Sequence, residues 1–182
     1  MLRRLFRVLP AIAMLTFSSC GTLAASLAQE YLNFETVCLV VEIEADTHFE
    51  EMFDRRLVSE GAIGVIEQLL RNRPFNYPVE SGRQCFPGKV GSAPRQLSLQ
   101  FHVTVASGSN PQYPIATAVI AHSFYEGISR PPHNYPTKIG FCANADRTQI
   151  TACMQGHIVK YFDDIVLPAF ERVEPHRTRR PK

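Results

Sequence analysis

The side chains with the most chemical potential in this sequence are acids and imidazoles on the polar positions of expected strands. In chain order they are Glu42, Glu44, Gln100, His102, Thr104, His122 and Glu126. Two imidazoles with carboxylates nearby can bind a divalent metal ion or transfer a proton. A strand pairing that sets His102 opposite His122 would assemble such a site, but the sequence does not fix that register.

An ordinary solvated face, typical of a sheet covered on one side only, explains the same residues. The sequence contains no G-x-S-x-G, P-loop, post-strand G-x-G-x-x-G or H-E-x-x-H motif, so nothing marks a catalytic residue, a metal site or a cofactor site. We favour the solvated face. Five of its residues are kept as candidate ligand-binding residues: Glu42, Glu44, Gln100, His102 and His122.

Alternating segments must position these side chains. Apolar residues occupy every second position from Thr36 to Ala45 and again from Leu97 to Val105, which predicts two strands with one buried face each. A turn cluster over 107–111 then leads to a third strand from Ile115 to Tyr125.

Helical spacing appears in two further segments. Thr47 and Glu50 resemble a capping box, after which apolar residues at helical spacing continue towards Pro74, with glycines that predict a break near Ser59. Residues 148–173 form the second helical segment, which Pro168 is expected to kink or divide. Residues 74–95 and 130–138 are rich in turn formers and predict irregular loops.

The order of these elements is strand, helix, loop, strand, strand, helix. It predicts an α+β two-layer sandwich, in which an antiparallel or mixed sheet carries helices on one face. A chain of 182 residues has room for one such domain. We place it at residues 29–174, after an N-terminal segment 1–28 and before a basic tail 175–182.

The N-terminal segment has the pattern of an export signal. Three arginines lie within the first seven residues, and no charge follows until Glu30. Three outcomes are open: cleavage after Ala28, lipidation of Cys20, or retention as a membrane anchor helix. All three deliver the domain to the periplasm or cell envelope, whereas a buried N-terminal helix in a cytosolic protein is the remaining alternative.

The cysteine count agrees with export. Without Cys20, four cysteines remain, and an even number in an exported domain predicts two disulfides. Of the three pairings we favour Cys142 with Cys153, which closes a short loop, and Cys38 with Cys85, which joins a strand to a long loop. Free thiols or a metal site are the alternatives, although no pair has the close spacing of zinc ligands.

The charge balance of the chain also disfavours one class of function. The chain has 19 basic and 17 acidic residues, and after the N-terminal arginines and the basic tail are set aside the domain is mildly acidic, which disfavours nucleic-acid binding. We therefore expect an exported, non-catalytic envelope protein, without a cofactor, that binds another envelope protein or a small ligand. The alternatives are a small periplasmic hydrolase that uses the polar sheet face and an accessory subunit of an envelope complex.

Overall fold

Six strands and two long helical segments make up the part of the chain that the computed structural model describes, residues 34, 36–74, 77–81, 96–125, 133–143 and 146–173. The strands are β1 (Thr36–Ala45), β2 (Val79–Ser81), β3 (Gln96–Asn110), β4 (Tyr113–Tyr125), β5 (His133–Asn134) and β6 (Lys138–Cys142). A short 3-10 helix, η1 (Thr47–Phe49), precedes the helix α2 (Arg55–Arg71). The last segment joins α3 (Arg147–Tyr161), a π-helical turn η3 (Phe162–Val166) and α4 (Leu167–Val173).

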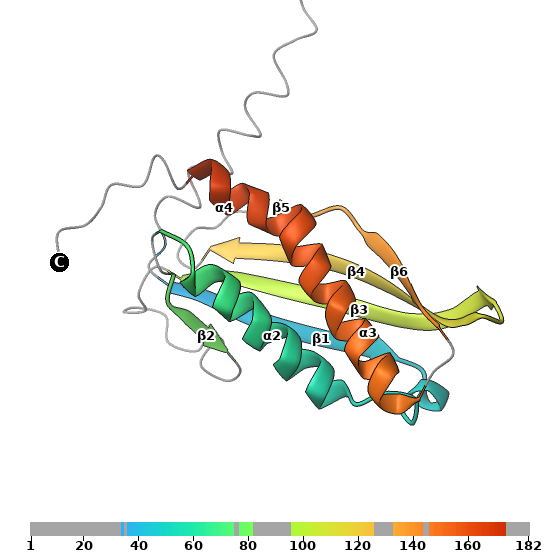
Figure 1. Ribbon diagram of the computed structural model, residues 1–182. Coiled ribbons are helices and arrows are strands. Elements are labelled where there is room, and N and C mark those ends of the chain that lie inside the picture. Colours follow the sequence, from blue (N-terminus) through green and yellow to red (C-terminus); the bar gives the residue numbers. More distant parts are fainter. Residues whose placement is uncertain are drawn as a thin grey trace, which may run out of the picture.

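The strands form one mixed sheet in the order β2-β1-β3-β4-β5, and β6 also pairs with β4. β1 runs parallel to β2 and β3, whereas β4 is antiparallel to β3, β5 and β6. Both long helical segments lie across the same face of this sheet (Figure 1). The expected α+β architecture, with a mixed sheet and helices on one face, is therefore confirmed.

The core lies between the sheet and these helices. The alternation predicted for the first two strands holds, because Val37, Leu39, Leu97, Leu99 and Phe101 are all fully buried. The helices contribute apolar side chains at helical spacing: Val58, Ala62, Ile66 and Leu70 from α2, and Ile150, Met154 and Ile158 from α3.

The side chain of Tyr161 contacts the outer edge of β4 between the two short strands that pair with that edge, β5 and β6. The Ala121 N–H donates to the Tyr161 hydroxyl at 3.1 Å, and that hydroxyl donates to the Pro136 carbonyl at 2.9 Å. Burial raises the pKa of Tyr161 above its ordinary value of 10.0, which keeps the proton needed for this donation. The side chain thus satisfies a backbone group that no strand partner reaches.

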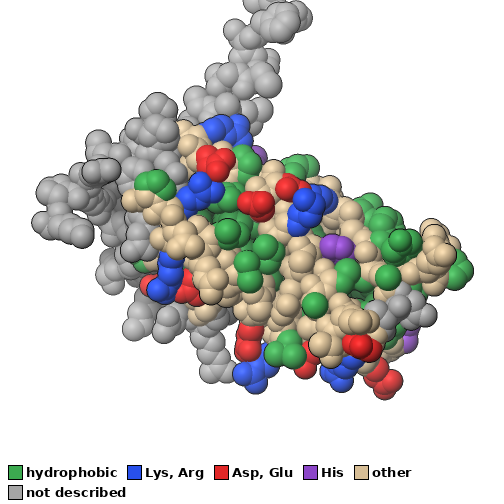
Figure 2. All heavy atoms as spheres, in the orientation of Figure 1, with side chains coloured by type: hydrophobic (Ala, Val, Ile, Leu, Met, Phe, Trp, Pro, Cys, Tyr) green, Lys and Arg blue, Asp and Glu red, His purple; other side chains and the backbone are tan. Residues whose placement is uncertain are grey.

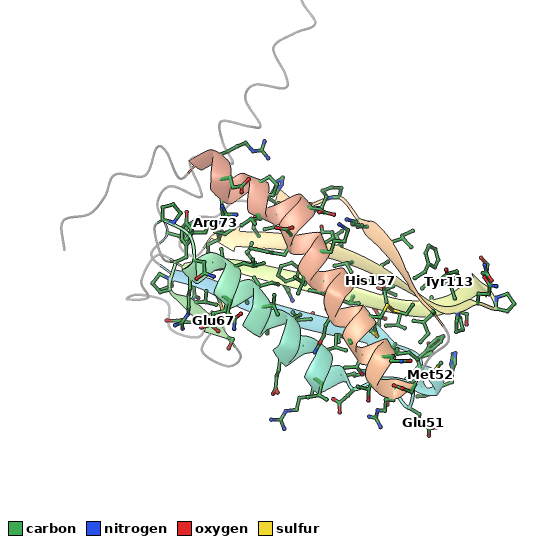
Figure 3. The ribbon with its side chains drawn as sticks, viewed as in Figure 1. Glu51, Met52, Glu67, Arg73, Tyr113 and His157 are labelled. Atoms are coloured by element: carbon green, nitrogen blue, oxygen red, sulfur yellow. A yellow bond between two sulfur atoms is a disulfide. The ribbon has the colours of Figure 1, made fainter. Side chains whose placement is uncertain are left out.

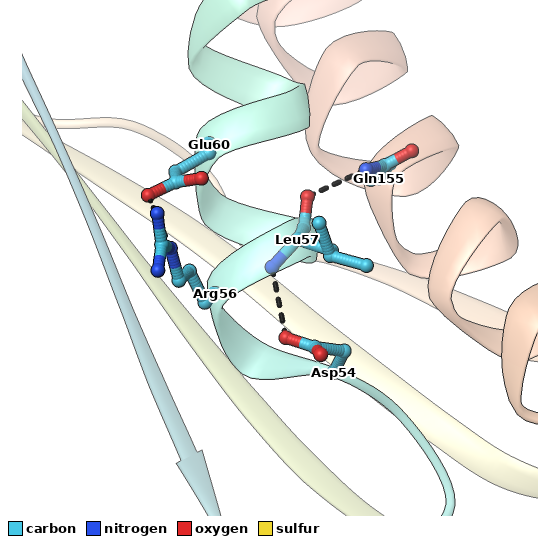
Figure 4. A network of polar contacts seen from close by, with 5 residues as sticks. All are labelled: Asp54, Arg56, Leu57, Glu60 and Gln155. Carbon is cyan, nitrogen blue, oxygen red and sulfur yellow. Dashed lines mark hydrogen bonds and ion pairs between the residues drawn. The ribbon is translucent and has the colours of Figure 1, made fainter.

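The two helical segments contact each other closely at Gly61. A Cβ at that position would lie 2.0 Å from Nε2 of Gln155, so the missing side chain leaves room for α3. Gln155 Nε2 donates to the Leu57 carbonyl at 2.6 Å, and the Leu57 N–H donates to the Asp54 side chain that caps α2 (Figure 4). The glycine that weakens the helix in isolation therefore serves the helix contact.

Two helix predictions need correction. α2 is continuous through Ser59, and the interruption lies before Asp54, whose side chain accepts from Leu57 N–H. Thr47 and Glu50 do not form a capping box, because Thr47 instead opens the 3-10 helix η1. The expected irregularity at Pro168 takes the form of the π-helical turn η3 directly before it, since proline cannot donate a helical hydrogen bond.

The segments expected as loops contain the short strands β2 and β5, and β6 begins at the last residue of the second of these segments, Lys138. Residues 1–28 and 175–182, and with them the predicted export signal, Cys20 and the basic tail, lie outside the described residues. No helix within the described ranges is long and apolar enough to cross a bilayer. On the face that carries the helices, basic and acidic side chains are interspersed (Figure 2), and pairs such as Arg56 with Glu60 are in contact.

Candidate functional site

The sheet face opposite the helices, here called the open face, carries the candidate ligand-binding residues. The strand register places on it Glu42, Glu44, Gln100, His102, Thr104, His122, Ile139 and Phe141. Glu42, Glu44 and Thr104 are exposed, while Gln100, His102 and His122 are half-buried. The first six of these residues were expected to share one face and do so, whereas Ile139 and Phe141 were not among the candidates.

A row of polar side chains crosses the open face from β1 to β5. Glu42 Oε2 lies 3.2 Å from His102 Nδ1, and the rings of His102 and His122 are 5.1 Å apart between centroids. His122 Nδ1 lies 2.6 Å from Asn134 Oδ1. Four strands thus each contribute one member of a connected polar row.

The register that forms this row differs from the one considered in the sequence. His122 pairs with Gln100, and His102 pairs with Ile120, so the two histidines are diagonal neighbours and not directly opposite. Diagonal side chains on one sheet face remain within reach of each other when they are long or aromatic. Glu44 lies beside Thr104 one step along the sheet, and Glu126 is outside the described residues.

The row can accept and donate hydrogen bonds, and the Glu42 carboxylate can orient the His102 imidazole. Within the described ranges, the one group of three histidine, cysteine or acidic residues close enough to share a metal ion is Cys142, Cys153 and His157, on the other side of the sheet. The side chains of the row can hydrogen-bond a polar group of a ligand.

Two large apolar side chains also lie exposed on the open face, further along β4 than the row, at the register positions of Ala118 and Ala116. Ile139 is 63% exposed and Phe141 is 53% exposed, and both belong to the short strand β6 that the sequence did not predict. Exposed aromatic and aliphatic side chains next to polar groups are typical of surfaces that bind other proteins.

A second cluster lies between α3 and the strands β4 and β6, around His157 (Figure 3). Its Nδ1 is 2.7 Å from Thr117 Oγ1 and its Nε2 is 3.7 Å from Cys153 Sγ. Burial lowers the pKa of His157 below its ordinary value of 6.5, and the charge of Lys138 lowers it further. The imidazole is therefore held in its neutral form.

A cavity of about 200 Å³ opens beside His157. It is lined by Val119, Lys138, Ile139, Gly140, His157 and Lys160. Asp164 contacts both lysines, and the hydrogen bond from Lys138 lowers the pKa of the Asp164 carboxyl below its ordinary value. The charges at the mouth of this cavity are thus largely paired with one another.

Sequence reasoning missed this cluster because it depends on register. Thr117 is, with Ser123, one of two buried polar residues on the inward face of β4, and it lies opposite Gly140 of β6. His157 follows Cys153 by one helical turn on α3. The sequence does contain a signal for this cluster. It is a polar residue at an inward strand position together with a histidine one helical turn after a cysteine.

The cysteines follow the expected arrangement where the structure describes them. Cys142 and Cys153 form a disulfide with their Cα atoms 5.9 Å apart, as predicted. Cys38 is also disulfide-bonded, and its partner lies outside the described residues, as does Cys85. The pairing of Cys38 with Cys85 therefore stays a prediction.

Comparison with known proteins identifies no family. No protein-family model matches the sequence, and no curated protein shows significant similarity to it. Two solved structures resemble the fold: an uncharacterized protein (TM-score 0.44, 8% identity, 79% of this chain and 94% of that chain) and a putative neuraminyllactose-binding hemagglutinin homolog from Helicobacter pylori (TM-score 0.42, 12% identity, 78% and 85%). We assign no function to this chain from either likeness.

Proposed function

We propose that this chain is an exported, non-catalytic binding or accessory protein of the cell envelope, and that the open face is its binding surface. The observation that carries the proposal is the composition of that face. A connected polar row, Glu42 to Asn134, lies on the same surface as the exposed side chains of Ile139 and Phe141. Such a surface offers an apolar anchor and hydrogen-bonding groups to one partner.

Two sequence features and one structural feature support export. The N-terminal segment combines early arginines with a long uncharged stretch, and Cys20 lies where a lipid anchor would be attached. The disulfide between Cys142 and Cys153, with the further bond at Cys38, suits an oxidising compartment. An envelope partner, either a protein or a small ligand, follows from that location.

Site-specific photo-crosslinking in cells that produce the protein tests the proposal. A photoreactive residue at Thr104, exposed on the open face, should yield a discrete crosslinked product, whereas the same residue at Arg56, exposed on α2, should not. Equal products from both positions, or a product from Arg56 alone, would contradict the assignment of the open face.

A matched pair of substitutions sharpens this test. Phe141→Ser removes an exposed apolar side chain from the open face, and Leu57→Ser removes one that is equally exposed, at 54%, from α2. We expect Phe141→Ser to weaken the crosslinked complex at least about tenfold, as for a central interface residue, and Leu57→Ser to leave it unchanged. An unchanged complex in the Phe141 variant argues against its role as an anchor.

The alternative of a small periplasmic hydrolase is favoured by one observation, the contact of Glu42 with His102 at 3.2 Å. A carboxylate that orients an imidazole can make it a general base. If this is the function, hydrolysis of p-nitrophenyl acetate should be lost in Glu42→Gln and His102→Gln but kept in His48→Gln, an exposed histidine on η1. Equal rates in all three variants would exclude a role for the pair.

The third candidate function, an accessory subunit of an envelope complex, predicts that this chain is present in a fixed ratio to its partner chains. Copurification from membranes with partners in fixed ratio would distinguish a subunit from a solitary binding protein. The exposed edge strand β6, with Ile139 and Phe141, is the contact surface we expect in that case.

A further inference from the structure

The group formed by Cys142, Cys153 and His157 has the composition of a metal site. Each residue offers one ligand atom, and these atoms lie within 4.8 Å of one another. Cys142 ends the strand β6, whereas Cys153 and His157 lie four residues apart on α3 and so share one helix face. Two thiolates and an imidazole are a typical zinc ligand set.

One edge of a zinc coordination sphere is already in place. With Zn–S of about 2.3 Å, Zn–N of about 2.0–2.1 Å and tetrahedral angles, sulfur and nitrogen ligands lie about 3.6 Å apart. The distance between Cys153 Sγ and His157 Nε2 is 3.7 Å. To complete the set, Cys142 Sγ must leave its bond to Cys153, move to about 3.8 Å from that sulfur, and lie about 3.6 Å from His157 Nε2, from which it is now within 4.8 Å.

Hydrogen bonding sets the imidazole in the form that ligates a metal. Thr117 Oγ1 lies 2.7 Å from Nδ1 of His157 and 3.4 Å from the Gly140 carbonyl; when its own proton is donated to that carbonyl, Thr117 Oγ1 accepts the proton on Nδ1. The lone pair then resides on Nε2, the atom that faces the sulfur. Ligating histidines are commonly fixed in this way by a hydrogen bond from the other ring nitrogen.

The His157 ring packs closely against β6 and also lines a cavity. A Cβ on Gly140 would lie 2.5 Å from the His157 ring, so only glycine lets this ring pack against β6. The cavity of about 200 Å³ is large enough for a water molecule; His157 lines it together with Lys138 and Lys160, whereas neither cysteine does. Tetrahedral zinc bound by three protein ligands keeps such a fourth position open.

We propose that, once the bridge between Cys142 and Cys153 is reduced, these two cysteines and His157 bind one Zn²⁺ ion. A dithiol reductant supplies two electrons and two protons, becomes a disulfide itself, and leaves two protein thiols. Both thiols release their protons to solvent as their thiolates bind zinc. The bridge and the zinc site exclude each other, because each uses the same two sulfur atoms. In the oxidising compartment proposed for this chain the bridge persists, so the zinc site forms only where a dithiol reductant opens it.

Metal titration of the full-length, untagged protein tests the proposal. The protein is treated with dithiothreitol, which is then removed under nitrogen, and Co²⁺ is added as a spectroscopic probe. We expect one Co²⁺ per chain with a thiolate charge-transfer band that Zn²⁺ abolishes, and no such band in the oxidised protein. The Cys142→Ala, Cys153→Ala double variant should lack the band although it keeps Cys38.

Two further variants separate this site from adventitious thiol binding. His157→Asn should weaken Zn²⁺ binding at least about tenfold, and Thr117→Val, which removes only the hydrogen bond to Nδ1, about 10–100-fold. His48→Asn, an exposed histidine elsewhere, should bind as the wild type does. Wild-type affinity in the His157 and Thr117 variants, or equal binding by oxidised protein, would overturn the proposal.

The folding of the reduced chain gives a second test of the proposal. If the reduced chain unfolds without metal, Zn²⁺ should restore its circular dichroism spectrum and raise its Tm, because metal binding then contributes to folding. Failure of Zn²⁺ to restore the fold, or equal restoration in the Cys142→Ala, Cys153→Ala variant, would overturn the proposal as well.

Discussion

Removal of the disulfide between Cys142 and Cys153 should cost the domain about 3 kcal/mol of unfolding free energy. The two residues are 11 apart in sequence, and closing a loop of that length restricts the unfolded chain by about that amount at 25 °C. Alanine is the suitable replacement because Cys142 is fully buried and a serine hydroxyl there would add an unsatisfied group. Urea unfolding of the oxidised double variant measures the loss.

Reduction of the wild type provides the matching control. A reductant opens the bond at Cys38 as well, so we expect oxidised wild type to be the most stable, the oxidised double variant to be intermediate, and reduced wild type to be the least stable. A double variant within about 1 kcal/mol of the wild type would refute the assignment of this bridge as a structural brace.

Three further changes test the packing. Gly64→Ala should raise the free energy of unfolding by about 1 kcal/mol, because a Cβ there meets nothing within 4 Å, whereas Gly61→Ala should gain less because it displaces the Gln155 amide; urea unfolding compares them. Tyr161→Phe should cost about 1–3 kcal/mol in the same assay, since Ala121 N–H loses its acceptor. The His157 titration midpoint measured by NMR should lie below 6.5. The unfolded chain then binds the proton more readily than the folded one. The contribution of neutral His157 to the free energy of unfolding should therefore be complete above about pH 6.5 and be lost as the pH drops towards the folded pKa. A midpoint at or above 6.5 would contradict the burial of this ring.

Much of the fold follows from local pattern. The alternation in residues 36–45 and 97–105 identifies long strands that are buried on one face, and that same alternation assigns Glu42 and His102 to the open face. The hydrophobic effect makes such patterns reliable, because a slip of one residue would expose every apolar side chain of the strand.

The remainder depends on pairing that the sequence does not encode locally. β5 and β6 contain two and five residues, and they are strands only because β4 offers them an edge. The register of β3 and β4 depends on the turn at Pro111 and Gln112 and on a shift in pairing between Ser107 and Asn110, and it makes His102 and His122 diagonal neighbours. The cluster at His157 likewise requires β6 to lie beside Thr117.

Export is the claim on which the account of function depends, and the intact mass of the protein isolated from the cells that make it tests this claim most directly. The account predicts a chain cleaved after Ala28, or one lipid-modified at Cys20, or one that still carries its uncharged segment in a membrane fraction. It also predicts that reduction adds two hydrogen atoms for each bridge, including the one between Cys142 and Cys153. A full-length chain recovered from the cytosol, with Met1 retained and every thiol free, would contradict it.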